Sequence, residues 1–493
     1  MIGSIDSGDG GRDIVSVSVK SSGVSTLLMT FELVLPAAGR APSGGVIDRC
    51  GASQVRAAVI TVPQGISYPA YGVSGCNGCG RYERMEGPLT GTRVIDLSQY
   101  IAGPYCGRIM AGFGADVIKV EPPDGDPIRR WGPFPEAAPN PETGAFHLYL
   151  NQGKRSVTLD IETEDGRALL RELLGTADVL IESFRPGMLA SLGFGYEQLK
   201  EEFPGLLYVS VTPFGQTGPY AQYHAWEITT YALSGLMYIT GEPDREPLKN
   251  GGYLGQYGAG QNAYIATLAG LWERAVSGLG QHVDVSVFEH ATSLLEMTDM
   301  AYIYAGQIYP RSGNGARAAW GIYPCADGFV GVVSGPLRRW ANIATLMEEP
   351  ILANSRYQQA GSQSELRDEI DALMLPWLIT HEKEEIYQKA QALGLPFGYV
   401  ATPADLFKNE QLQYRGFFHE VDHPVAGKLR YPSIAAHFSD GLWESRRAPL
   451  LGEHTNEVVA SLGHDAASRA QLSAAGAFGG ATHGVSATSG GTR

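Results

Sequence analysis

The chain has 493 residues, of which 44% are hydrophobic and 18% charged, and its formal net charge is −15. This length allows two or three domains, and the composition is that of an ordinary globular protein. The acidic balance argues against a nucleic-acid surface, which needs a basic stripe, and no apolar run reaches the roughly 18 residues of a membrane-spanning helix. We therefore expect neither a nucleic-acid partner nor a membrane.

The five cysteines are an odd number without the spacing of a disulfide framework. This favours a reducing compartment and predicts a cytoplasmic protein. Cys76 and Cys79 form a lone C-x-x-C with no second pair, whereas a zinc site needs four ligands, so no metal site is expected.

Both ends of the chain differ from the rest. Residues 1–84 are rich in Gly, Ser and Val without a sustained period, and residues 467–493 are rich in Ala, Gly, Ser and Thr. Such segments bury too little apolar surface to fold by themselves. The sequence predicts a disordered extension before Met85 and a disordered tail from residue 467.

The first periodic stretch predicts a βαβ unit. Residues 94–97 are a short apolar run rich in β-branched residues and typical of a buried strand, residues 116–121 are a second strand, and Ser98 is a candidate N-cap of the helix between them. Helical spacing relates Cys106, Ile109, Met110 and Phe113, and Gly114 ends the helix. The turn after the first strand lacks the G-x-G-x-x-G of a dinucleotide site.

Strands and helices continue to alternate along the chain. Further strands are predicted at residues 156–160, 178–182, 206–211 and 283–286, and Thr163 is placed to cap the helix after the first of these. The alternation predicts an α/β fold with a doubly wound parallel sheet. Ligands bind beyond the carboxyl ends of such strands, so the loops 98–103, 183–187 and 213–218 are expected to converge on one site.

The second half is less regular. Residues 226–305 read as long helices interrupted by a glycine-rich stretch, and residues 311–330 are glycine-rich before they turn into a strand. Residues 335–405 are mostly helical, and from about residue 407 the chain is punctuated by prolines and poor in strand signals.

Several stretches in this order resemble the class III CoA-transferases, the group of formyl-CoA transferase and carnitine CoA-transferase. The resemblance covers roughly residues 87–472 and is carried by VIDLSQYIAGP, GADVIKVEPP, NQGKRSVTLD, ADVLIESFRPG, PFGQTGPY, SGLMYITG, GQHVDVSVFE and RAPLLGEHTNEV.

The resemblance implies a domain arrangement and a dimer. Residues 85–307 and a returning segment, 406–466, would build a large CoA-binding domain. Residues 308–405 would form an inserted smaller α/β domain, with a glycine loop at 313–315. Two chains would interlock, as a homodimer or with a paralogue.

The resemblance also implies the chemistry. The family moves CoA from an acyl-CoA to a carboxylic acid, with CoA as a substrate and no permanently bound cofactor. An Asp side chain attacks the thioester, because a carboxylate can accept CoA and return it at similar energy. In this chain the matching position holds Gln256, whose amide cannot form the anhydride intermediate. Trp226 stands where related racemases have a catalytic His.

Glu227 matches a family acid close to the thioester, and its alternative is a helix N-terminal acid favoured by the helix dipole. The resemblance places CoA contacts at Tyr100, Ile101, Leu159, Ser183, Phe184, Arg185 and His224. Lys119, Lys154 and Arg155 are further candidates for phosphate contacts, and for Lys154 and Arg155 structural roles are at least equally open.

Three readings follow. The chain is a CoA-transferase acting on acyl-CoA; or it is a non-catalytic subunit that pairs with a paralogue bearing the Asp; or it uses Glu227 for proton transfer on an acyl-CoA. Several aromatic residues occur near Glu227 and Gln256 in the sequence and would suit a bulky or aromatic acyl group: Tyr223, Trp226, Tyr231, Tyr253 and Tyr257.

Overall fold

The computed structural model describes residues 2–6, 14–18, 87–314, 317–334, 339–359, 361–439 and 441–479. The chain divides into two compact units, residues 1–83 and 84–493. In the first unit, strands β1 (Ile2–Asp6) and β2 (Ile14–Ser18) pair antiparallel. The rest of the predicted extension, including the C-x-x-C pair, lies outside the described residues, as do residues 480–493 of the predicted tail.

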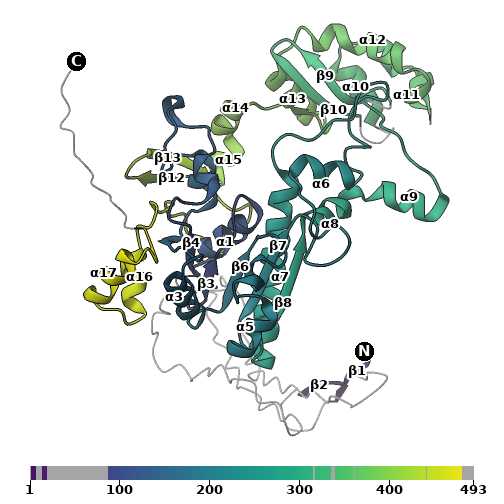
Figure 1. The fold of residues 1–493 in the computed structure, drawn as a ribbon. Coiled ribbons are helices and arrows are strands. Elements are labelled where there is room, and N and C mark those ends of the chain that lie inside the picture. The colour runs from purple at the N-terminus through teal and green to yellow at the C-terminus, as the bar shows by residue number, and fades with distance from the viewer. Residues whose placement is uncertain are drawn as a thin grey trace, which may run out of the picture. The chain divides into compact units, whose positions relative to one another are not determined.

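A six-stranded parallel sheet organises the second unit, and its strand order is β5-β4-β3-β6-β7-β8 (Figure 1). The strands are β3 (Arg93–Asp96), β4 (Asp116–Glu121), β5 (Arg155–Thr158), β6 (Val179–Glu182), β7 (Leu207–Thr212) and β8 (His282–Ser286). The first strand of this sheet in chain order, β3, lies in its middle. The next strands β4 and β5 are added on one side and β6, β7 and β8 on the other, so the predicted doubly wound sheet is confirmed. Its topological switch point lies between β3 and β6.

Helices cover both faces of this sheet, because residues along each strand point alternately to one face or the other. One face packs against α1 (Ala102–Gly112), α7 (Leu254–Ser277) and α8 (Val287–Thr292). The other packs against α3 (Glu164–Leu174), α4 (Met188–Ser191), α5 (Tyr196–Glu202) and α16 (Thr455–Ser461). Strands buried on both faces explain the continuous apolar runs of the sequence.

Of the two predicted helix N-caps, Thr163 is confirmed and Ser98 is not. Thr163 caps α3 by accepting a hydrogen bond from the backbone N–H of Gly166. Ser98 does not cap α1, whose N-cap is Ile101. The Ser98 hydroxyl bonds instead to Asp96 in the loop after β3. The prediction for Ser98 is therefore wrong, because the helix begins only at Ala102, and the Ser98 hydroxyl donates its proton to the buried Asp96 carboxylate in the loop before it.

Helix α7 crosses close to α1. A Cβ built on Gly260 would lie 2.5 Å from the carbonyl oxygen of Ala102, so only glycine permits this approach. Two shorter helices, α6 (Glu227–Leu233) and α9 (Met297–Ala305), flank the region. No residue of α9 is buried.

A second hydrophobic core forms between residues 318 and 397. Its antiparallel sheet has the order β11-β10-β9, with β9 (Trp320–Cys325), β10 (Gly328–Val333) and β11 (Gly398–Tyr399). Its helices are α10 (Trp340–Leu346), α11 (Ser362–Glu365), α12 (Arg367–Leu378) and α13 (Lys383–Ala392). The fold thus adds a smaller antiparallel-sheet part to the parallel sheet.

The C-terminal region corrects two predictions. The stretch expected to be poor in strands contains an antiparallel hairpin, β12 (Phe418–His423) and β13 (Gly427–Pro432), after α14 (Pro403–Lys408) and α15 (Glu410–Tyr414). The predicted tail contains α17 (Ala466–Ala474), followed by the buried residues Ala477 and Phe478. Packing, not local pattern, orders both segments: Val421 and Tyr431 of the hairpin pack with Leu148 and Ala448, and Ala477 and Phe478 join the core of the parallel sheet.

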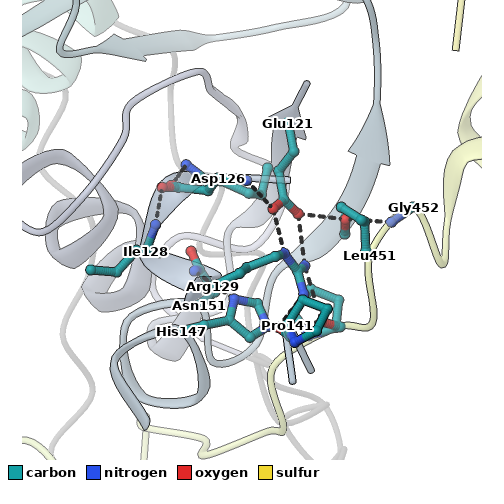
Figure 2. A network of polar contacts seen from close by, with 12 residues as sticks. Glu121, Asp126, Ile128, Arg129, Pro141, His147, Asn151, Leu451 and Gly452 are labelled. Atoms are coloured by element: carbon teal, nitrogen blue, oxygen red, sulfur yellow. Dashed lines mark hydrogen bonds and ion pairs between the residues drawn. The ribbon is translucent and has the colours of Figure 1, made fainter. Parts of the chain in front are cut away.

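A buried ion pair ties the returning C-terminal segment to the first βαβ unit (Figure 2). The Arg129 guanidinium donates to both carboxylate oxygens of Glu121, at 2.6 and 2.8 Å, and both side chains are fully buried. Arg129 also donates to the carbonyl oxygen of Pro449 at 3.4 Å. Helix α2 (Ala145–Leu150) adds a contact between His147 and the same carbonyl oxygen at 3.1 Å.

Candidate functional site

A pocket of about 280 Å³ opens at the switch point of the parallel sheet. Its walls are the loop after β3 (residues 99–102), the loop after β6 (183–186), the end of β7 and the following loop (211–213 and 221–227), and the start of α7. The three predicted loops therefore meet there, although the third contributes only its first residue, Pro213. Crevices beyond the carboxyl ends of such strands are where α/β sheets bind ligands.

All of the predicted site residues except Leu159 line this pocket: Tyr100, Ile101, Ser183, Phe184, Arg185, His224, Glu227 and Gln256. Leu159 follows β5 and is 1% exposed within the hydrophobic core of the sheet. The next residue, Asp160, donates its backbone N–H to Ala477 at 2.9 Å. The C-terminal segment thus runs beside Leu159, whose side chain faces the core.

A buried charge cluster shapes the loop after β3. The carboxylate of Asp96 accepts hydrogen bonds from the Ser98 backbone N–H at 3.0 Å and from the Lys154 ammonium at 2.8 Å. Lys119 bonds to the Ser98 carbonyl oxygen and pairs with Asp126 at 3.0 Å. Burial lowers the pKa of Lys154 to about 8 in spite of Asp96 beside it.

This cluster corrects two candidate phosphate contacts. Lys119 and Lys154 are at most 1% exposed at their side chains, and their ammonium groups are already paired, so both are structural. Arg155 pairs with Asp116 at 2.6 Å and with Glu457 at 3.1 Å, outside the pocket. Sequence spacing could not reveal the pairs of Lys154 and Arg155, because Asp96 lies 58 residues from Lys154 and Asp116 lies 39 residues from Arg155.

Tyr100 projects from that loop in a strained backbone conformation, with φ +63°. A non-glycine residue adopts this left-handed region only where the surroundings hold it. The neighbouring Gln99 donates its N–H to the Ser183 hydroxyl at 2.8 Å, which links the loops after β3 and β6. The Tyr100 ring contacts Trp131 and Trp226 at centroid distances of 5.5 and 5.2 Å.

Glu227 holds the start of helix α7. Its carboxylate accepts hydrogen bonds from the backbone N–H groups of Gly255 at 2.8 Å and of Gln256 at 3.1 Å, and the residue is 4% exposed. These N–H groups belong to the first helical turn, where no intrahelical acceptor exists and the helix dipole favours negative charge. Glu227 therefore caps a second helix, α7, in addition to opening its own.

Gln256 lies directly in this arrangement, with its backbone fixed by Glu227 and its half-buried side chain on the pocket wall. A carboxamide donates and accepts hydrogen bonds but stays uncharged near neutral pH. The site thus places a neutral hydrogen-bonding group next to an engaged carboxylate.

Glu182, the last residue of β6, holds the following loop through hydrogen bonds. Its carboxylate accepts a hydrogen bond from the Phe184 N–H at 2.7 Å and one from the Gln216 amide at 3.3 Å. Burial raises the pKa of Glu182 to about 7. Arg185, two residues beyond Ser183, is exposed and donates to the Gln222 side chain at 2.8 Å.

Sequence reasoning missed Trp131, which lines the pocket and contacts four of its aromatic neighbours. It follows the 3-10 turn Pro127–Arg130 in a proline-rich loop without periodicity. No local signal marks such a residue, because its position depends on Tyr100, Trp226 and Tyr253 from other elements.

No described helix has the length and apolarity to cross a bilayer. Nor do the described residues contain a group of three or more side chains that would hold a metal ion.

The model of CoA-transferase family III matches residues 89–455. A succinate–glutarate CoA-transferase of Agrobacterium fabrum (strain C58 / ATCC 33970) is 36% identical over 389 residues, which cover 76% of this chain and 96% of that protein. The succinyl-CoA:(R)-benzylsuccinate CoA-transferase subunit BbsE of Thauera aromatica is 32% identical, over 76% of this chain and 94% of that protein.

A CAIB/BAIF family protein from Brucella suis has a similar solved structure, with a TM-score of 0.70 and 33% identity over 76% of this chain and 99% of that chain. The family match spans the sheet, the pocket and the second core, so this chain belongs to CoA-transferase family III.

Proposed function

We propose that this protein binds acyl-CoA thioesters and acts in the transfer of CoA between an acyl-CoA and a carboxylic acid. The observation that carries the proposal is the pocket at the switch point, where loops from three strands meet the start of α7. Relatives such as the Agrobacterium fabrum protein are named as CoA-transferases for carboxylic acids.

In this proposal the loops after β3 and β6 bind CoA. Arg185 and His224 supply the cationic and hydrogen-bonding groups of the lining that suit phosphate oxygens, and Tyr100, Ile101 and Phe184 supply apolar surface. Ser183 fixes the two loops to each other through its hydrogen bond with Gln99. No permanently bound cofactor is required, since CoA itself is the substrate.

The three hypotheses for the site differ in which residue, if any, acts as the nucleophile. An acyl transfer through an enzyme anhydride needs an ionised carboxylate, which Gln256 lacks. Glu227 has the carboxylate, but its oxygens already accept two backbone hydrogen bonds at 2.8 and 3.1 Å. Attack or protonation at Glu227 would weaken these two hydrogen bonds and with them the cap of α7, so the geometry favours Glu227 as a positioning residue.

The alternative function is a non-catalytic subunit paired with a paralogue that carries the Asp. The named relative BbsE is itself a subunit. Exposed apolar side chains on α7 and α9 also favour a partner chain: Ile265, Trp272, Met297, Tyr302, Ile303 and Tyr304 are each between 62% and 80% exposed. A solvent-facing apolar surface of this kind marks an interaction site.

We therefore propose a dimer, either homomeric or with a paralogue, located in the cytoplasm. The cytoplasmic assignment rests on the odd cysteine count and on Cys106 and Cys325, which are free thiols among the described residues.

The test is a screen of acyl-CoA donors and carboxylic acid acceptors with the purified full chain, alone and together with any paralogue that has Asp at the Gln256 position. Calorimetry would measure CoA binding and chromatography would measure exchange. Binding with exchange only in the mixture would support the subunit reading, and exchange by the chain alone would support independent catalysis. Absence of CoA and acyl-CoA binding under both conditions would refute the proposed function.

A further inference from the structure

Four aromatic side chains from four separate elements form one wall of the pocket. Tyr100 comes from the loop after β3, Trp131 from the loop after β4, and Trp226 and Tyr253 are the N-cap residues of α6 and α7. Ring centroids lie 5.5 Å apart for Tyr100 and Trp131, 5.2 Å for Tyr100 and Trp226, and 5.8 Å for Trp131 and Trp226. We call these four residues the aromatic wall.

The aromatic wall stands beside the reacting position. Tyr253 precedes Gln256 by three residues on α7, and Trp226 directly precedes Glu227. Trp131 joins the two sides, since its ring lies 5.8 Å from Trp226 and 6.1 Å from Tyr253. Phe146 supports the wall from behind, at 6.0 Å from Trp131 and 5.6 Å from Tyr253.

Ordinary core packing does not account for this cluster. Trp340, a core tryptophan of the second sheet, is 1% exposed, whereas Trp226 is 54% exposed and the other three wall residues are partly exposed. The wall therefore keeps ring surface open to the pocket. Aromatic rings at centroid distances of 4.5–7 Å prefer edge-to-face or offset contacts, and a further ring would continue the same pattern.

The pocket has room for such a ring. A protein cavity of roughly 150 Å³ accommodates benzene. The pocket volume of about 280 Å³ therefore holds one aromatic ring together with the thioester end of CoA.

The charges of the lining disfavour a second carboxylate on the acyl group. Among the side chains that line the pocket, the cationic candidates are Arg185 and His224, and Arg185 already bonds to Gln222. Beside the wall stand the carboxylate of Glu227 and the neutral amide of Gln256. A dicarboxylic acyl group would bring a like charge toward Glu227 without a dedicated cation, and this costs binding energy.

From the wall, the volume and the charges we infer that the acyl group handled at this site is aromatic and carries no second carboxylate. The inference rests on the proposed CoA function and adds the class of the acyl group. The aromatic wall acts as its specificity determinant.

The test is calorimetric titration of the full chain with four probes: phenylacetyl-CoA, hexanoyl-CoA, succinyl-CoA and CoA. Phenylacetyl-CoA is expected to bind about tenfold more tightly than succinyl-CoA, the factor that one or two favourable ring contacts contribute, and more tightly than hexanoyl-CoA. Trp226→Leu is expected to lower the ratio of phenylacetyl-CoA to succinyl-CoA affinity to below about threefold. Tyr414→Leu, at a tyrosine 92% exposed on α15, is the control and keeps the wild-type ratio.

Each of the other outcomes would refute either the inferred acyl specificity, the role of the aromatic wall or the proposed CoA function. Succinyl-CoA binding as tightly as phenylacetyl-CoA would refute the inference while leaving the CoA function intact. Equal binding of hexanoyl-CoA and phenylacetyl-CoA would show that the site selects apolarity and not an aromatic ring. An unchanged ratio in Trp226→Leu, with wild-type assembly in sedimentation, would remove the aromatic wall as its cause. Failure of all four probes to bind would refute the proposed function, and the inference with it.

Discussion

Gln256 and Glu227 share the start of helix α7 but have different physical roles. The Glu227 carboxylate satisfies two N–H groups of the first turn, and the Gln256 side chain faces the pocket. The charged residue thus caps the helix, and the uncharged one lies on the pocket wall, at the position where the family resemblance predicts the nucleophile. Substitutions at these two positions should separate catalysis from stability.

Gln256→Glu is expected to create a trappable enzyme thioester, because it changes only the terminal amide to a carboxylate. Gln256→Asp places the carboxylate one methylene closer to the backbone and tests whether it still reaches the thioester. Each variant would be incubated with acyl-CoA and a carboxylic acid, treated with hydroxylamine or borohydride, and mapped by peptide mass spectrometry. The unmodified chain is the control and is expected to show no label at Gln256. A label on Glu227 in the unmodified chain would contradict the capping role.

Glu227→Ala should destabilise the protein by about 1–2 kcal/mol, because two N–H groups of α7 lose their acceptor in a buried position. Urea denaturation would measure the change in the free energy of unfolding. Glu164→Ala, an exposed first-turn acid of α3, is the matched control with an expected change below about 0.5 kcal/mol. Equal effects of the two substitutions would show that the cap contributes nothing beyond surface charge.

Glu182 gives the protein a pH-dependent stability. Burial raises its pKa from 4.5 to about 7, so between these pH values the folded protein binds more protons than the unfolded chain. The free energy of unfolding is therefore expected to fall as pH rises from 4.5 to 7, by about 3 kcal/mol at 1.36 kcal/mol per pKa unit, and to receive no further change from Glu182 well above pH 7.

Glu182→Gln is expected to remove this decline, because a carboxamide does not titrate. Denaturation curves at pH 5, 6, 7 and 8 would compare the variant with the wild type. Glu197→Gln, with a side chain 77% exposed, should keep the wild-type slope. Parallel stability profiles for wild type and Glu182→Gln would refute the raised pKa.

At the scale of elements, strand β4 and the C-terminal segment are joined by the pair of Glu121 and Arg129. Burial by itself would raise the pKa of Glu121, but the Arg129 guanidinium holds it well below its usual range. The same guanidinium donates to the Pro449 carbonyl oxygen, and the Glu121 carboxylate accepts the Ser156 hydroxyl of β5 at 2.7 Å. This network fixes the returning segment to the sheet.

Glu121→Gln is expected to lower the free energy of unfolding by about 3–5 kcal/mol, because it leaves a buried guanidinium with incomplete compensation. Chemical denaturation would measure the loss. The control is Asp124→Asn in the exposed pair with Arg130, whose side chains are 70% and 56% exposed, and its effect should be at most about 1 kcal/mol. A Glu121→Gln variant as stable as the control would mean that the buried pair adds no net stability.

At the scale of the whole molecule, the apolar side chains of α7 and α9 predict that the protein assembles as a dimer. Interlocked chains cannot separate without unfolding, so sedimentation at micromolar concentration should give the mass of two chains. Tyr304→Glu introduces a charge at an 80% exposed position of α9 and should reduce the yield of folded dimer. Tyr414→Glu, at 92% exposure, is the control and should not. A stable folded monomer would contradict the interlocked assembly.

The sequence by itself determined the parallel sheet and the loops of the site. Residues 94–97 and 116–121 form β3 and β4 within one residue of the prediction, because β-branched residues such as Val94, Ile95, Val117 and Ile118 favour buried strands and this preference is local. The alternation of strands and helices then placed the loops after β3 and β6 at one end of the sheet. Family motifs predicted the pocket residues of those loops, and also Glu227 and Gln256 at the starts of α6 and α7.

The tertiary structure alone decided which polar groups are free to bind. Lys119 and Lys154 lie within the predicted motifs but are neutralised by Asp126 and Asp96, and Glu227 caps a helix that begins 27 residues after it. Trp131 joins the pocket only through rings from other elements, and the hairpin of β12 and β13 forms in a stretch without a strand pattern. The pairing of Lys154 with Asp96, the cap that Glu227 provides and the ring contacts of Trp131 join residues distant in sequence, and local propensity and spacing carry no record of them because burial and pairing are set by packing.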